Sequence, residues 1–223
     1  MNTSFAKLLS SVFVSALYLV CLNKVMADDE HEHVYITHDL PYVEVINKGK
    51  PVRIQRNADT LNIIHSEYAL TSRPCPPFCI QPMVLAPGVE TIGELELIDY
   101  LRAISAGNQD LMVVDSRTDD WTKLSGIIPG AVIIPWDKLF LARNEPEKVA
   151  EILEDKFKAR RVGPLWDFSQ AKTLILYCNG AWCGQSPTNI KTLLSLGYPA
   201  NKLKWYRGGM QDWESLGLTT VEP

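Results

Sequence analysis

Short apolar runs alternate with helix-start patterns along the second half of this chain, and this alternation constrains its fold more than any other feature. The runs occupy residues 111–114, 131–134 and 174–177, and residues 203–206 predict a further short strand. Strands of a parallel sheet have nearly continuous apolar sequences because helices bury both of their faces. We therefore expect an α/β domain with a largely parallel sheet and helices on both sides.

Polar residues that commonly begin helices separate these runs. Thr91 starts a capping-box pattern with Glu94, and Asn144 and Ser186 each stand shortly before or beside a proline at an expected helix start. The expected helices span residues 91–104, 144–157, 186–196 and 210–216. The helices expected at residues 144–157 and 186–196 each connect two of the predicted strands, as parallel strands require.

Cys178 ends the third apolar run, and a six-residue loop joins it to the helix expected at Ser186. The loop consists of Asn179, Gly180, Ala181, Trp182, Cys183 and Gly184. A tight loop at a helix N-terminus directs several N–H groups at one point, which favours an anion. Such surroundings lower the pKa of a thiol, so Cys178 is expected to be a nucleophilic thiolate. The alternative is an inert cysteine buried among apolar residues.

Four motifs over residues 91–223 resemble, in order, those of a single rhodanese-like (sulfurtransferase) domain. They are Val113 to Arg117 with its Asp-x-Arg, Gly126 to Pro135 with its Ile-Pro-Gly-Ala, the strand ending at Cys178, and Arg207-Gly208-Gly209 to Trp213 followed by Gly217-Leu218. Each motif alone is weak, but the order of all four within one domain is specific.

The resemblance implies a five-stranded, largely parallel sheet flanked by helices, with Cys178 accepting a sulfane sulfur as a persulfide. The implied partners are a small sulfur-donor molecule and a thiol acceptor, either a small molecule or a protein, with no cofactor or metal. By the same resemblance, residues 179–184 form the substrate-binding loop, and Asp115 and Arg117 form a structural ion pair. The resemblance also implies that three residues of the last motif serve in packing: Gly208, Gly209 and Trp213.

One position departs from the family pattern. In sulfurtransferases an arginine often closes the active loop at the position where this chain has Cys183. The related dual-specificity phosphatases need an arginine one residue later, where this chain has Gly184, so phosphatase activity is not expected. Without a fixed cation, the dianion thiosulfate is also a poorer donor.

The second thiol, Cys183, has three candidate roles. It attacks a persulfide on Cys178 and releases sulfide, it holds Cys178 as a resting disulfide, or it is a small packing residue. Trp182, between the two thiols, is expected to pack over the loop rather than to bind substrate.

Residues 28–90 form an N-terminal extension, in which residues 42–46 and 51–55 predict a hairpin around an Asn-Lys-Gly-Lys turn. Cys75 and Cys79 flank a Pro-Pro-Phe loop, and they are either a local disulfide or a dithiol that docks near Cys178. We expect the extension to wrap the domain near the active loop, since it is too long for a simple linker.

Residues 1–27 predict a secretory signal, with Lys7 before an uncharged apolar core and a small-residue cleavage pattern at residues 25–27. Export to the periplasm or outside the cell would place the remaining cysteines in an oxidising compartment. After cleavage no membrane segment is expected. The formal net charge of −4 gives no indication of nucleic-acid binding, and the cluster His31-Glu32-His33 lacks a third ligand for a metal.

Three functions compete on this sequence. The first is an exported sulfurtransferase that uses Cys178, with Cys183 as the resolving thiol. The second is a thiol–disulfide redox protein that uses the same two cysteines on a rhodanese-like scaffold. The third is a non-catalytic module that only binds a partner. This function stays open because the chain lacks the arginine that often closes the active loop of sulfurtransferases.

Overall fold

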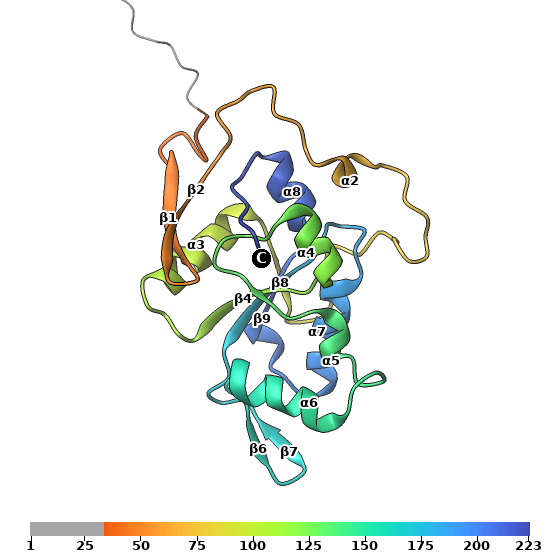
Figure 1. Ribbon diagram of the computed structural model, residues 1–223. Coiled ribbons are helices and arrows are strands. Elements are labelled where there is room, and N and C mark those ends of the chain that lie inside the picture. Colours follow the sequence, from red (N-terminus) through yellow and green to blue (C-terminus); the bar gives the residue numbers. More distant parts are fainter. Residues whose placement is uncertain (1–33) are drawn as a thin grey trace, which may run out of the picture. The chain divides into compact units, whose positions relative to one another are not determined.

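The computed structural model describes residues 34–223, whose ribbon is shown in Figure 1. The predicted signal at residues 1–27 and the start of the extension, residues 28–33, lie outside the described residues. Within residues 34–223 no helix is long and apolar enough to cross a membrane.

Five parallel strands form the central sheet in the order β3-β9-β8-β4-β5. Their bounds are β3 Glu90–Ile92, β4 Leu111–Asp115, β5 Val132–Ile133, β8 Thr173–Tyr177 and β9 Leu203–Tyr206. The predicted α/β class, its four strands and the five-stranded parallel sheet are confirmed. The edge strand β3 was missed, because it is three residues long and its Thr91 suggested a helix cap instead.

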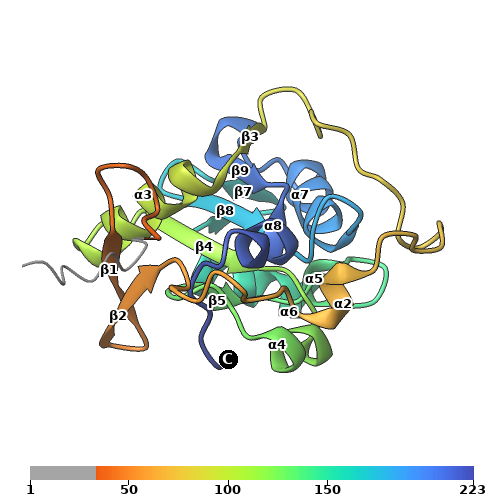
Figure 2. The same cartoon turned by 90° about the horizontal axis from the view of Figure 1, so that it is seen from above.

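Alternate residues of the central strand β8 enter two separate cores, one on each face of the sheet. Leu174 and Leu176 pack in one core, whereas Ile175 and Tyr177 pack in the other. Helices α5 (Trp136–Leu139), α6 (Pro146–Glu151) and α7 (Gln185–Ser195) contribute to the first core. Helices α3 (Glu94–Ser105) and α8 (Gly209–Ser215) contribute to the second. Figure 2 shows the strands fanned between these helices.

The predicted hairpin in the extension is present as the antiparallel strands β1 (Tyr42–Asn47) and β2 (Lys50–Gln55). Val43, Val45 and Ile54 are buried and join the core that contains α3 and the sheet residues Ile175 and Tyr177. The hairpin is therefore a part of the domain core and not a separate appendage.

Two helix starts differ from the prediction. Helix α3 begins at Glu94 after Gly93, whose backbone N–H donates to the side chain of Glu96 at 3.0 Å, so the capping box lies two residues later than expected. Helix α7 begins at Gln185 with Gly184 as its N-cap. The expected cap, Ser186, therefore lies inside the first turn, which frees its hydroxyl for another partner.

The predicted helix at residues 144–157 begins at Pro146, and Glu145 rather than Asn144 is its N-cap. Its second half is a π-helix, Ile152–Lys156. The remaining short elements have no clear hydrophobic period and were missed: α2 Ser66–Ala69, α4 Asp119–Ser125, β6 Arg160–Val162, β7 Leu165–Asp167 and the 3-10 helix Ala200–Lys202.

Candidate active site

Cys178 directly follows β8, at the carboxyl edge of the sheet where side chains from neighbouring strands converge. Asp115 ends the adjacent strand β4 at the same level, opposite Tyr177. The backbone oxygen of Cys178 accepts the N–H of Met210 at 3.0 Å, and only 2% of the residue is exposed. The thiol is thus held in a fixed position below the surface.

Ser186 and Trp205 orient a hydrogen bond onto the sulfur of Cys178. The indole N–H of Trp205 donates to the hydroxyl oxygen of Ser186 at 3.1 Å, and that hydroxyl donates to Cys178 Sγ at 3.1 Å. Because the oxygen already accepts from Trp205, its own proton is available for the sulfur. Sequence reasoning missed both residues, since Ser186 had been assigned to the helix cap.

The hydrogen bonds around Cys178 lower the pKa of its thiol. Burial alone would raise the pKa of this thiol, but hydrogen bonds from Cys183, from the side chain and backbone of Ser186 and from the backbone of Gly180 outweigh burial. The pKa of Cys178 therefore lies below its ordinary value. The expectation of an activated thiol rested on a backbone cradle, whereas the structure adds a hydroxyl donor.

The second thiol, Cys183, has the opposite character. Burial raises its pKa well above the ordinary value, and its hydrogen bond to Cys178 and the charge of that thiolate raise it further. Its exposure is 4%, and the side-chain amide of Asn179 lies 3.9 Å from its sulfur. Of the two thiols, Cys178 is therefore the more acidic and Cys183 the less acidic.

The predicted binding loop, residues 179–184, is tied to the domain and to the extension. Ala181 O accepts the backbone N–H of Gln81 at 2.8 Å, and the indole N–H of Trp182 donates to Gln211 Oε1 at 2.8 Å. The loop closes on itself through the N–H of Cys183, which donates to Gly180 O at 2.9 Å.

The close approach of α8 to this loop requires glycine at position 209. Gly209 has a φ of +57°, and a Cβ there would lie 2.3 Å from the backbone oxygen of Cys178. Any other residue would therefore displace the cysteine that it supports. Trp213, on the same helix, is fully buried, so both act as the packing residues that the family resemblance implied.

The predicted ion pair between Asp115 and Arg117 is present and fully buried, with Nη2 and Oδ2 2.6 Å apart. Arg117 also donates to Gly126 O at 2.6 Å and to the hydroxyl oxygens of Ser125 at 2.9 Å and Tyr68 at 3.1 Å. With every donor engaged in the protein, the guanidinium holds the loops after β4 in place. It is a structural cation and not a substrate-binding one.

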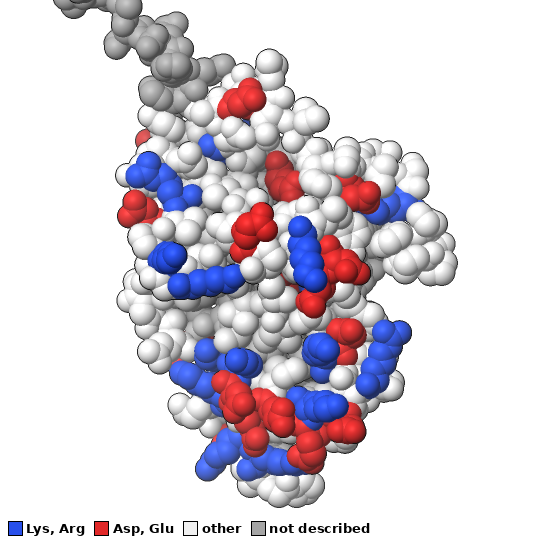
Figure 3. All heavy atoms as spheres, viewed as in Figure 1, with Lys and Arg blue, Asp and Glu red and all other residues white. Residues whose placement is uncertain are grey.

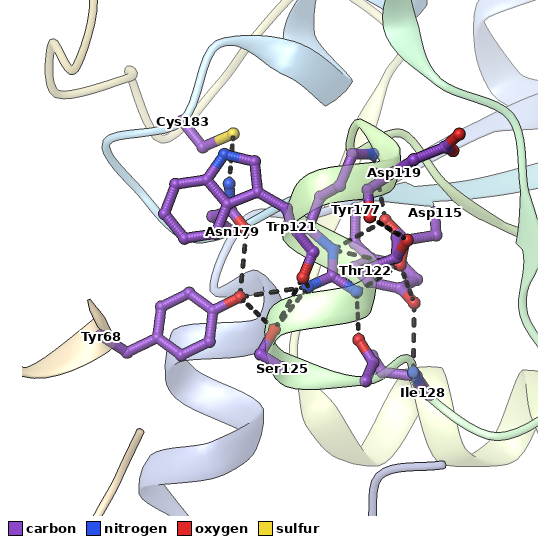
Figure 4. Close-up of polar contacts among 12 residues, drawn as sticks. Tyr68, Asp115, Asp119, Trp121, Thr122, Ser125, Ile128, Tyr177, Asn179 and Cys183 are labelled. Atoms are coloured by element: carbon purple, nitrogen blue, oxygen red, sulfur yellow. Dashed lines mark hydrogen bonds and ion pairs between the residues drawn. The ribbon is translucent and has the colours of Figure 1, made fainter. Parts of the chain in front are cut away.

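Tyr68 of helix α2 connects this ion pair to the active loop, as Figure 4 shows. Its hydroxyl donates to Asn179 Oδ1 at 3.0 Å, and the amide of Asn179 in turn faces the sulfur of Cys183. Burial raises the pKa of Tyr68 to about 12, even though the charge of Arg117 lowers it. No sequence signal pointed to Tyr68, which lies more than a hundred residues before Asn179.

The loop with Cys75 and Cys79 lies against the active loop, as expected for the extension. The ring of Phe78 meets Trp182 edge to face at 5.5 Å between centroids, and the guanidinium of Arg73 lies 4.1 Å from the centroid of Trp182. The sulfur atoms of Cys75 and Cys79 are within bonding distance, with their Cα atoms 4.6 Å apart. Trp182 therefore packs under the extension, in agreement with its predicted role.

A cavity of about 230 Å³ adjoins the active loop. Its walls are formed by Pro77, Phe78, Trp121, Trp136, Asn179, Cys183, Gly184, Gln185 and Thr188. Cys183 lines this cavity, whereas Cys178 is buried and is not one of its lining residues. A second cavity, of about 780 Å³, has Arg56, His65 and Glu214 in its walls but neither thiol, so the smaller cavity is the candidate substrate site.

The described residues contain no group of three or more histidine, cysteine, aspartate or glutamate side chains that could hold a metal ion.

The comparisons place this architecture in a known family. A model of the rhodanese-like domain matches residues 97–216, which is more than half of the chain. The chain therefore belongs to the rhodanese-like domain family. A search of curated proteins found no match.

Several solved structures are similar to this chain. One is a protein of unknown function from Rhodopseudomonas palustris, described as a possible tyrosine phosphatase, with 19% identity over 61% of this chain and 88% of its own and a TM-score of 0.43. A thiosulfate sulfurtransferase from Pseudomonas aeruginosa has 20% identity over 60% of this chain and 20% of its own, with a TM-score of 0.39. A polysulfide-sulfur transferase from Wolinella succinogenes has 17% identity over 62% and 82%, with a TM-score of 0.39.

Proposed function

We propose that this protein is an exported sulfurtransferase that carries sulfane sulfur as a persulfide on Cys178, with Cys183 as the resolving thiol. One observation carries the proposal: Ser186, Gly180 and Cys183 donate hydrogen bonds that lower the pKa of Cys178 in spite of its burial. A thiolate at neutral pH is the form that attacks a sulfane sulfur.

In the loading step, the Cys178 thiolate attacks the outer sulfur of a donor. The donor's S–S or S–sulfonate bond breaks, and the rest of the donor leaves with the bonding electron pair as a thiolate, a shorter polysulfide or sulfite. A new S–S bond forms on Cys178. The persulfide is also anionic at neutral pH, so the donors that stabilise the thiolate also stabilise the carried sulfur. The partners are therefore a small sulfur-donor molecule and a thiol acceptor, with no role for nucleic acid or a membrane.

In the resolving step, the Cys183 sulfur attacks Cys178 Sγ. A Cys178–Cys183 disulfide forms, the bond between Cys178 Sγ and the outer sulfur breaks, and the outer sulfur of the anionic persulfide leaves as hydrosulfide with the proton of the Cys183 thiol. The raised pKa of Cys183 keeps this thiol protonated and slow to attack, which protects the persulfide until an acceptor arrives.

The test is the intact mass of the reduced protein, before and after polysulfide or thiosulfate, with Cys178→Ser and Cys183→Ser alongside. We expect a gain of one sulfur atom that requires Cys178 and that lasts longer in Cys183→Ser. Absence of any sulfur adduct on protein that was reduced first and freed of reductant before the donor was added would exclude the proposal.

A thiol–disulfide redox protein is the second candidate, and the hydrogen bond between the two thiols favours it, since the sulfurs are already neighbours. It predicts a reversible Cys178–Cys183 disulfide and little sulfur transfer. A reduction potential well below about −300 mV would instead indicate a structural bond.

Export is supported by the signal pattern of residues 1–27 and by the bonding distance between Cys75 and Cys79, which suits an oxidising compartment. Mass spectrometry of the protein from its host, without reduction, tests both points. We expect a chain that begins after residue 27 and lacks two hydrogens at Cys75 and Cys79.

A further inference from the structure

Three of the nine residues that line the cavity beside Cys183 are aromatic. Phe78 comes from the extension, Trp121 from α4 and Trp136 from α5, so three separate elements supply rings to one small space. Its volume of about 230 Å³ is below the range of about 300–1,000 Å³ that holds drug-sized ligands. The space suits a molecule of about one ring or a short alkyl chain.

None of the residues that line this cavity is charged. Its polar lining residues include Gln185, whose side-chain oxygen is buried and has no hydrogen-bond partner among the described residues. An unpaired carbonyl oxygen prefers a hydrogen-bond donor and repels an anion. The extension segment at residues 70–89, which supplies Phe78, carries one charged residue, Arg73. Figure 3 shows that this segment, at the right, has a largely uncharged surface.

The cations near the cavity do not line it. Arg117 is neutralised by Asp115, and Arg73 stacks on Trp182 and lies 3.6 Å from the carboxylate of Glu67. Arg143 lies 5.0 Å from the ring centroid of Trp136 but is exposed to solvent. An anion in the cavity would therefore gain no direct cation. The N-terminus of α7, whose residues Gly184 and Gln185 line the cavity, favours an anion only weakly, which does not offset the loss of the anion's hydration.

We infer that the sulfur acceptor of this site is a mainly apolar thiol with no charged group besides the reacting sulfur, which binds in this cavity, rather than a thiol that also carries a carboxylate. The inference rests on the proposed function and specifies its substrate class. In the transfer, the acceptor thiolate attacks the outer sulfur of the Cys178 persulfide. The S–S bond to Cys178 breaks with its electron pair on Sγ, and the overall exchange converts acceptor thiol and protein persulfide into acceptor persulfide and protein thiol.

The test uses two acceptors that differ by one carboxylate, benzyl mercaptan and 4-(mercaptomethyl)benzoate. Protein loaded with polysulfide is mixed with each, and the loss of the added sulfur is followed by intact mass. We expect benzyl mercaptan to remove sulfur at least about ten-fold faster at equal thiolate concentration, because only the carboxylate must be desolvated. Equal rates of sulfur removal, or faster removal by 4-(mercaptomethyl)benzoate, would overturn the inference.

A charge placed in the cavity wall gives a second comparison. Gln185→Lys should raise the relative rate of the carboxylate acceptor by about ten-fold, whereas the neutral control Gln185→Met should leave the ratio near that of the native protein. Any general effect on Cys178 cancels in the ratio of the two acceptors. If the ratio of the two acceptors' sulfur-removal rates is the same in Gln185→Lys as in the native protein, acceptors do not bind in this cavity.

Binding to Cys178→Ser separates this inference from the proposed function. Calorimetric titration with benzyl alcohol and with benzoate measures the preference of the cavity without sulfur chemistry. Preference for the alcohol supports an uncharged ligand even if polysulfide loads no sulfur and the sulfurtransferase proposal fails. Tighter binding of benzoate, or no binding of benzyl alcohol, contradicts the inference even if loading succeeds.

Discussion

At the residue scale, the sulfur of Cys178 accepts a hydrogen bond from Ser186, a residue that the sequence analysis expected to cap a helix. Ser186 directly follows the first residue of α7, and its hydroxyl lies 3.1 Å from Cys178 Sγ. Cys178 could be predicted because it directly follows a buried strand, and the pair of Asp115 and Arg117 was predicted from the family resemblance. The role of Ser186 could not be predicted, since a shift of one residue in the helix start decides which way its side chain turns.

Ser186→Ala is expected to raise the pKa of Cys178, because the thiolate loses a hydrogen-bond donor while its burial remains. The rate of iodoacetamide alkylation, which follows the thiolate, should rise with pH through this pKa and then level off. In the native protein the alkylation rate should rise at a pH below that at which an ordinary thiol ionises. In the variant the rise should move to higher pH.

The control for this variant is Ser195→Ala at the other end of the same helix. The hydroxyl of Ser195 donates to Thr192 O and makes no contact with either thiol. Its profile should match that of the native protein. If both serine variants leave the profile unchanged, the hydroxyl is not what lowers the pKa of Cys178.

At the element scale, the sheet was predictable and the short connecting elements were not. The strands β4, β8 and β9 are apolar because both of their faces are buried, and this property is visible in the sequence. Helix α2 has four residues, and nothing in its sequence indicates that it lies beside a loop far along the chain. Contacts between distant segments depend on packing and have no local signal.

Tyr68→Phe is expected to lower the free energy of unfolding by about 1–3 kcal/mol, because buried Asn179 Oδ1 and a donor of Arg117 both lose a partner. Urea unfolding measures the change. Tyr100→Phe is the control, since Tyr100 on α3 packs on the same core and its hydroxyl is in none of the described hydrogen bonds. Equal stability of the two variants would mean that the Tyr68 hydroxyl bonds add nothing.

At the scale of the whole molecule, the extension completes the core. The family match begins at residue 97, yet the hairpin before it supplies buried side chains to the core on one face of the sheet. The sequence predicted the hairpin from its turn, but not that it packs on α3. The hairpin could not be placed by the family match, because it lies before the matched residues 97–216.

Ile54→Ala is expected to destabilise the whole domain by about 2–5 kcal/mol, because Ile54 is fully buried and a cavity would remain. The urea midpoint and the loss of β-sheet signal should move together if hairpin and domain unfold as one unit. Ile46→Ala on the same hairpin is the control, with 45% of its surface exposed and a much smaller expected effect. Separate transitions for hairpin and domain would contradict a shared core.

The burial of both free cysteines has a practical consequence for counting them. Cys178 and Cys183 are 2% and 4% exposed, under a loop of the extension. Ellman's reagent is a bulky aromatic disulfide with two carboxylates, so it should react slowly with the folded protein and release colour only after denaturant is added. A low thiol titre on native protein would then reflect access rather than oxidation, and only the titre in denaturant would report the redox state of the pair.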